Sequence, residues 1–249
     1  MVSTMRRLLT LIVALLATTS ILSAQQFDAN FSDSTLRLDY TFMGNASEQY
    51  IALRDITETD GWWGRRVNLG SVPLKGNGDL TLSDSETGEV IYKTSFSSLF
   101  QEWITTPEAS SITRSFEFTI LVPKPQRETV ATLVLRDNVG KESIHTFKLN
   151  PTDVLIGDRS RHEPLPHTYV HRGGDPKECI DVVILAEGYT ADEMEIFMED
   201  AKITATEILS YEPFKSYSAK FNFIAVMSPS RDSNVSVPQD EAWRSTAVG

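Results

Sequence analysis

Two different hydrophobic periodicities divide the chain near residue 150. Between Leu36 and Leu149 apolar and polar residues alternate, which places every second side chain on one face of a strand. The segments with this pattern are Leu36–Phe42, Tyr50–Arg54, Leu80–Leu82, Val90–Thr94, Phe116–Val122, Thr129–Arg136 and Ile144–Leu149. Many short strands without a long helical period predict an all-β sandwich.

The second half of the chain has a strand-helix-strand pattern. Ile180–Leu185 is a nearly continuous apolar run, as expected for a strand that is buried on both faces. Thr190 and Glu193 form a T-x-x-E capping box, which predicts the start of a helix. Apolar residues then recur at helical spacing at Met194, Phe197, Met198, Ala201, Ala205, Ile208 and Leu209. Phe221–Met227 is a second apolar strand, so the unit is most simply a parallel β-α-β crossover.

These patterns predict an α+β protein of two domains. We expect the sandwich over residues 25–156, a linker over 157–178 and the beginning of an incomplete α/β domain over 179–249. Prolines and glycines in the linker prevent a continuous helix. His167 and His171 are four residues apart and would align as metal ligands on a helix, but here we expect them to be linker residues.

The turn after the first strand of the second domain, Ala186–Thr190, excludes several common chemistries. It has no G-x-G-x-x-G for a dinucleotide, no G-x-S-x-G for a serine nucleophile and no phosphate-binding loop. Glu187 and Tyr189 lie where the strand ends, which is the side of an open α/β sheet on which ligands bind. We therefore consider both as residues lining a substrate cleft. The alternative is that Glu187 caps the loop and Tyr189 packs under the helix.

The N-terminus has the features of a secretory signal peptide over residues 1–24. Arg6 and Arg7 precede an apolar run from Leu8 to Ala17, and small residues surround the expected cleavage site after Ala24. The apolar run is shorter than the roughly 20 residues that a membrane span requires. We expect an exported protein, secreted or periplasmic, without a membrane anchor after cleavage.

The charge and the cysteine content exclude some classes of binding partner and exclude stabilisation by disulfides. The whole chain has a formal net charge of −11, and removal of Arg6 and Arg7 leaves 21 basic against 34 acidic residues. This sign argues against nucleic acid and anionic membranes as partners. Cys179 is the only cysteine, so no disulfide can form within the chain, and core burial must stabilise it.

Several segments carry a resemblance to one family. They are Ile91–Ala109, Arg114–Glu117, Leu135–Asp137, Asp181–Thr190, Glu212–Phe214 and Phe221–Asn222. The first three resemble the N-terminal domain of the IgA-peptidase-type family of bacterial zinc metallopeptidases. The last three resemble the start of the catalytic domain of the same family.

The resemblance implies a metzincin-like catalytic domain that hydrolyses peptide bonds in a protein or peptide substrate. In that family a later helix carries H-E-x-x-H and, with a third ligand, binds one zinc ion. H-E-x-x-H does not occur in these 249 residues, whose four histidines are His145, His162, His167 and His171. We therefore assign no catalytic, cofactor-binding or metal residue, and we expect this chain to bind no zinc and to be inactive alone.

A second interpretation is a secreted, non-enzymatic module. In it the sandwich binds a protein or a glycan, and the α/β segment is a degenerate remnant. Trp62 and Trp63 beside Arg65 and Arg66 are candidates for such a binding patch. Adjacent residues of a strand point to opposite faces, so we expect one tryptophan in the core and the other at the surface.

Overall fold

The computed structural model describes residues 27–72, 74–159 and 163–248. The expected signal peptide over residues 1–24 lies outside these ranges. The chain divides into two compact units, Met1–Arg161 and His162–Gly249. Of the helices in the described part, none is both long and apolar enough to cross a membrane.

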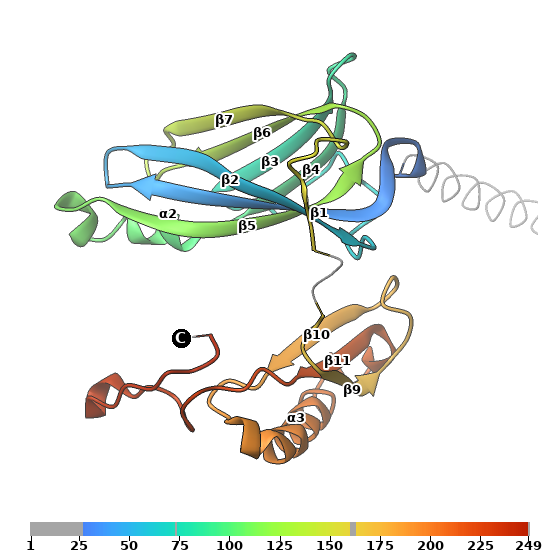
Figure 1. The fold of residues 1–249 in the computed structure, drawn as a ribbon, viewed down its shortest axis with the longest axis vertical. Coiled ribbons are helices and arrows are strands. Elements are labelled where there is room, and N and C mark those ends of the chain that lie inside the picture. The colour runs from blue at the N-terminus through green and yellow to red at the C-terminus, as the bar shows by residue number, and fades with distance from the viewer. Residues whose placement is uncertain (1–26, 73, 160–162, 249) are drawn as a thin grey trace, which may run out of the picture. The chain divides into compact units, whose positions relative to one another are not determined.

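The first unit contains two four-stranded sheets that lie face to face (Figure 1). The first has the order β5-β1-β2-β8 and the second β4-β3-β6-β7. The strands of the first sheet are β1 (Phe31–Gly44), β2 (Gln49–Asp60), β5 (Arg114–Pro125) and β8 (Gly157–Asp158). Those of the second are β3 (Gly78–Asp84), β4 (Val90–Phe96), β6 (Thr129–Arg136) and β7 (Glu142–Leu149). The predicted β-sandwich is confirmed.

The alternating residues of β1 form the centre of the sandwich core. Leu36, Leu38, Tyr40 and Phe42 are all 0% exposed, because alternate side chains of a strand point to the same face. Between β4 and β5 the chain forms a short helix, α2 (Leu99–Trp103), followed by a 3₁₀ turn, Glu108–Ser110. The side chain of Ser98 caps α2 by accepting a hydrogen bond from the backbone N–H of Gln101.

The second unit is a three-stranded sheet with one longer helix (Figure 1). Its elements are β9 (His167–Arg172), β10 (Ile180–Leu185), α3 (Met194–Ile208) and β11 (Phe221–Val226), with 3₁₀ turns at Ala191–Glu193, Ser218–Lys220 and Pro238–Asp240. The strand order is β10-β11-β9. β10 and β11 are parallel, which confirms the β-α-β unit, and β9 is antiparallel to β11. The helical stripe is also confirmed, with Phe197, Ala201 and Ala205 buried.

One prediction for this sheet is wrong. β10 is not buried on both faces: Ile180, Val183 and Leu185 are 58%, 55% and 43% exposed. β10 lies at the edge of the described sheet, and Val183 and Leu185 point to the face opposite that of Ile184, which packs against the buried residues of α3. A continuous apolar run shows that a strand is hydrophobic but not where it lies in the sheet.

The segment expected to be a linker, residues 157–178, contains two strands. β8 pairs with Thr57 and Glu58 of β2, and β9 pairs with β11. Pro164 and Pro166 lie before β9, and Gly173 and Pro176 follow it, so these residues bound the strand and leave its ladder intact. His167 and His171 therefore lie on a strand.

Candidate functional site

The carboxyl ends of β10 and β11 lie side by side and form the candidate site. The parallel pairing runs without a shift from Ile180↔Phe221 to Leu185↔Val226. The turn Ala186–Thr190 therefore leaves the sheet next to the segment that follows β11, Met227–Ser233. In open α/β sheets this is the side on which ligands bind.

Two serines that follow β11 support the turn after β10. The hydroxyl of Ser228 accepts a hydrogen bond from the Ala186 backbone N–H at 3.1 Å, and that of Ser230 accepts one from Gly188 at 2.9 Å. The backbone N–H of Ser230 donates to the carbonyl of Tyr189 at 2.7 Å. Both serines are buried. Their hydroxyls satisfy backbone donors that a buried turn would otherwise leave unpaired.

Gly188 is required at this turn for two reasons. Its φ is +78°, in the left-handed region that side chains disfavour. A Cβ at this position would also lie 3.0 Å from the carbonyl carbon of Asn234. The Gly188 carbonyl in turn accepts a hydrogen bond from the Asn234 backbone N–H at 2.7 Å. Close backbone packing thus holds the segment after β11 against the turn.

The structure places Glu187 and Tyr189 in this turn with partners of their own. The carboxylate of Glu187 accepts a hydrogen bond from the backbone N–H of Val248 at 3.1 Å. The Tyr189 hydroxyl donates to Asp200 at 2.8 Å, and its ring packs 5.5 Å from that of Phe197 on α3. The bond to Asp200 raises the pKa of Tyr189 above its usual value. Tyr189 is therefore a neutral hydrogen-bond donor near pH 7. Glu187 and Tyr189 are both partly exposed beside the carboxyl ends of the strands.

The predicted capping box is present at the start of the helix. The Glu193 carboxylate accepts hydrogen bonds from the Thr190 backbone N–H at 2.8 Å and from the Ser233 hydroxyl at 2.8 Å. The Thr190 side chain completes the box with the backbone of Glu193. The bond from the Thr190 backbone is the largest cause of a lowered pKa at Glu193. Glu193 thus joins the helix, the turn and the segment after β11.

The stability given by the Glu193 charge is expected to depend on pH. Because its pKa is lowered in the folded chain, its contribution is present in full above the unfolded pKa of about 4.3 and is lost as the pH falls through the folded value. Glu193→Gln should be less stable than the wild type at pH 7 and equal to it in acid. Urea unfolding followed by circular dichroism at both pH values measures this difference.

The matched control is Glu195→Gln, which removes a charge from the same helical turn without touching the cap. It should change the free energy of unfolding less than Glu193→Gln does. A Glu193→Gln deficit of the same size at neutral and acidic pH would show that the charge of the capping carboxylate contributes nothing.

Of the histidines that the structure describes, none belongs to a group of side chains that could hold a metal ion. His145 lies on β7 in the first unit, and His162 is outside the described residues. His167 Nδ1 lies 2.9 Å from the carbonyl oxygen of Leu165, and His171 Nε2 lies 3.0 Å from that of Ser218. Within the described ranges no group of three or more His, Cys, Asp or Glu side chains could hold a metal ion. These residues do not fit the three-ligand set of a catalytic zinc.

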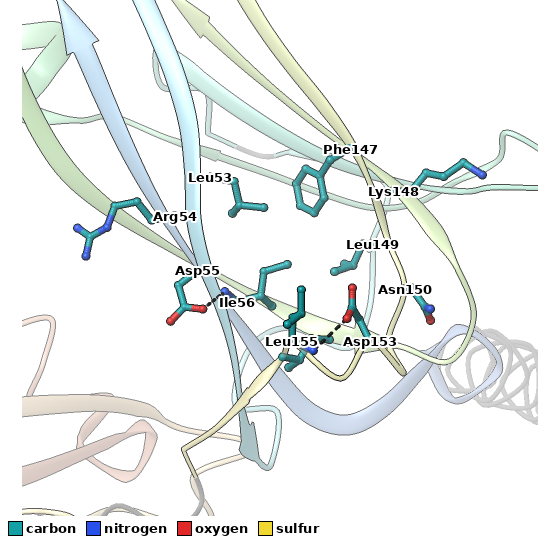
Figure 2. A pocket seen from close by; sticks show the side chains of 11 residues that line it. Leu53, Arg54, Asp55, Ile56, Phe147, Lys148, Leu149, Asn150, Asp153 and Leu155 are labelled. Carbon is teal, nitrogen blue, oxygen red and sulfur yellow. Dashed lines mark hydrogen bonds between the residues drawn. The ribbon is translucent and has the colours of Figure 1, made fainter.

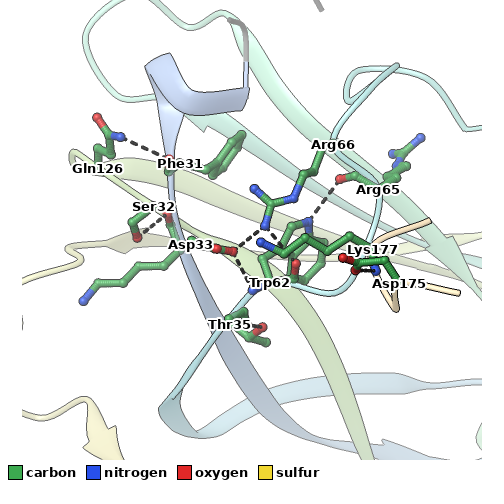
Figure 3. A network of polar contacts seen from close by, with 12 residues as sticks. Phe31, Ser32, Asp33, Thr35, Trp62, Arg65, Arg66, Gln126, Asp175 and Lys177 are labelled. Carbon is green, nitrogen blue, oxygen red and sulfur yellow. Dashed lines mark hydrogen bonds and ion pairs between the residues drawn. The ribbon is translucent and has the colours of Figure 1, made fainter. Parts of the chain in front are cut away.

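The tryptophan-arginine segment of the first unit is mainly structural. β2 ends at Asp60, so Trp62 and Trp63 lie in a loop and not in the expected strand. Trp62 is buried and Trp63 is 60% exposed, as predicted. Arg66 forms an ion pair with Asp33 (Figure 3). Its guanidinium also lies 4.5 Å from the ring centroid of Phe27.

Arg65 holds the same loop together through backbone carbonyls. Its guanidinium also lies 5.3 Å from the ring centroid of Tyr92, and its own carbonyl accepts the indole N–H of Trp62 at 3.0 Å. The carbonyls to which Arg65 donates belong to Asn68, Leu69, Ser71 and Lys93. Since both guanidinium groups have partners within the unit, only Trp63 is left for a ligand.

Sequence reasoning missed the part that Ser228 and Ser230 play at the site. The polar segment Ser228–Glu241 has two interpretations from sequence, a loop bordering the cleft or an exposed connection. The two hydroxyls face backbone donors about 40 residues earlier in the chain, so no local pattern indicates them. The nearest signal for their role is the spacing of the two serines, which are two residues apart and begin two residues after the end of β11.

Two family models match the chain. The model described as Peptidase M64 N-terminus matches residues 26–147. The model described as IgA Peptidase M64 matches residues 169–249. The first match covers the strands β1 to β6 and most of β7, and the second covers most of β9 and all of β10, α3 and β11, which carry the candidate site. No curated protein matches the chain.

Proposed function

Since the chain belongs to the M64 peptidase family, we propose that it is the N-terminal part of an exported, zinc-dependent peptidase that cleaves protein substrates. The observation that carries the proposal is the order of the two matches, with the N-terminal model followed by the peptidase model. The β10-α3-β11 unit supports it, because it has the parallel strand pair and the strand-end site of an α/β enzyme.

In this proposal the zinc ligands come from residues other than these 249. A catalytic zinc needs three protein ligands and an open position for water, and when bound it activates that water for attack on the peptide bond. The described residues do not supply such a set, and the sequence contains no H-E-x-x-H. The chain contributes instead the strands β10 and β11 and the helix α3, which form part of the cleft. Glu187 and Tyr189 line that cleft at the end of β10.

Export is the second part of the proposal. It is supported by Arg6 and Arg7, the apolar run from Leu8 to Ala17 and the small residues at Leu22–Ala24. A single cysteine is compatible with an oxidising compartment, because no disulfide has to form within the chain.

The test is to isolate the native protein from the culture medium or periplasm and to determine its intact mass and both terminal sequences. We expect it to begin at Gln25, to extend past Gly249 and to contain H-E-x-x-H. It should cleave an internally quenched peptide, lose that activity on chelation and regain it with zinc. The 249-residue chain alone should show no cleavage.

Two results would contradict the proposal. Zinc-dependent cleavage by the 249-residue chain alone would mean that its own residues form the metal site. A native protein that ends at Gly249 and has no peptidase activity would favour the secreted binding module, and the β-sandwich would then be the place to look for function.

A further inference from the structure

The two sides of the β-sandwich, where the outer strands of its sheets lie opposite each other, are built differently. On the side of β4 and β5, the rings of Phe96 and Phe118 lie 4.8 Å apart, and α2 packs beside β5. On the opposite side, β2 and β7 are the neighbouring strands of the two sheets. There the strands are tied at one end, where the Ser143 hydroxyl donates to the Gln49 carbonyl at 3.3 Å.

At the other end of this side, β2 and β7 separate and leave a cavity of about 280 Å³, which we name the β2–β7 slot. Its lining residues are Leu53, Arg54, Asp55, Ile56, Phe147, Lys148, Leu149, Asn150, Asp153, Leu155 and Ile156. Figure 2 shows the apolar side chains pointing into the slot, while Arg54 and Lys148 point away from it. The slot is therefore apolar inside and polar at its rim.

A free strand edge runs along the slot. β7 is the last strand of its sheet and pairs with β6 over eight consecutive residues without a bulge. In the described ranges no strand pairs with the other edge of β7, so its outward N–H and C=O groups can accept another strand. β2 is less suited to accept an added strand, because it contains a β-bulge. Its pairing with β1 shifts between Asp39↔Asp55 and Tyr40↔Leu53, which leaves Arg54 without a partner in β1.

We propose that the β2–β7 slot is an exosite for protein substrate: an extended segment adds as a strand to β7 and inserts one apolar side chain between the sheets. The inference rests on the proposed function, because a peptidase must hold polypeptide. An extended peptide is the occupant that uses both features, since its backbone pairs with the edge and its alternate side chains reach the slot. The slot, at about 280 Å³, lies just below the roughly 300–1,000 Å³ of pockets for drug-sized ligands, so it has room for an apolar side chain of the added strand.

The rim charges indicate which peptides bind best. Arg54 and Lys148 are paired within the unit, with Glu117 and Glu128. The carboxylates of Asp55 and Asp153 accept only local backbone hydrogen bonds, and among the described residues neither has an ion pair. The rim is therefore acidic, and it favours an apolar residue flanked by basic ones.

The probe is a fluorescent seven-residue peptide of threonines with leucine at the centre and lysine two positions to each side. Its binding to the purified chain is followed by anisotropy, and the contacted amides are found by NMR of the ¹⁵N-labelled chain. We expect shifts at Glu142–Leu149 and Asp153–Ile156. Replacing the central leucine by alanine should weaken binding about tenfold, and N-methylation of the backbone or glutamate in place of lysine should also weaken it.

The protein variant is Leu155→Asn, because Leu155 lines the slot yet is 82% exposed, so the substitution leaves the core intact and adds no charge to the rim. It should weaken peptide binding about tenfold. The matched control is Leu74→Asn, at an equally exposed leucine outside the slot (84%), which should bind as the wild type does.

Several results would overturn the exosite. They are absence of saturable binding, equal binding by both variants, shifts confined to other strands, or a chain that dimerises through β7 and excludes the peptide. The outcome is separate from that of the proposed function. A native protein that cleaves peptides but does not bind the probe would contradict the exosite and leave the proposed peptidase function intact. A native protein that binds the probe at the slot but lacks zinc-dependent cleavage would contradict the peptidase function and leave the slot as a peptide-binding site.

Discussion

Replacing Phe42 by alanine is expected to lower the free energy of unfolding of the β-sandwich by about 3–5 kcal/mol. Phe42 is 0% exposed and lies between the two sheets. Its ring centroid is 5.2 Å from that of Phe118 on β5 and 6.1 Å from that of Phe96 on β4. The truncation removes buried apolar area and leaves a cavity that the paired strands on both sides cannot close.

Urea unfolding of the chain, followed by tryptophan fluorescence, measures this effect, because Trp62 and Trp103 report on the first unit. The control is Met43→Ala, which removes a side chain from the next position of the same strand, where it is 40% exposed. It should cost less than about 1 kcal/mol. An equal decrease in the free energy of unfolding for the two variants would contradict the prediction. It would mean that the inward or outward direction of a β1 side chain does not determine how much that side chain stabilises the sandwich.

The first unit could be predicted well from sequence because its signal is local. The alternation over Leu36–Phe42 predicts a buried face from the two-sided geometry of a strand alone. The four apolar residues on that face, Leu36, Leu38, Tyr40 and Phe42, are all buried. The short helix Leu99–Trp103 was not predicted. Five residues are too few for a helical period, and its one signal is the capping serine at position 98.

The second unit shows what local patterns leave out. The capping box at Thr190 and Glu193 was predicted because its partners are three residues apart. The edge position of β10 and the entry of His167–Arg172 into the sheet depend on pairing with β11, about 40 to 60 residues away in the chain. The hydroxyls of Ser228 and Ser230 at the site have the same non-local origin.

The exposed strand β10 leads to the second large expected effect: residues 157–249 expressed alone should aggregate, while residues 25–156 should stay soluble. Ile180, Val183 and Leu185 are each more than 40% exposed on a strand whose outer edge no other strand covers within the described residues. Such an edge pairs with the same edge of another molecule. Light scattering and size-exclusion chromatography at several concentrations measure the association.

A double variant separates this mechanism from general instability. Val183→Lys with Leu185→Lys puts charge on the exposed face of β10 without touching the buried residues of α3, and charged edge strands resist pairing. The variant of residues 157–249 should therefore remain monomeric. Wild-type 157–249 that is monomeric and melts cooperatively would contradict the prediction. It would show that three strands and one helix bury enough apolar surface to fold, so that the exposed residues of β10 belong to the surface of a finished domain.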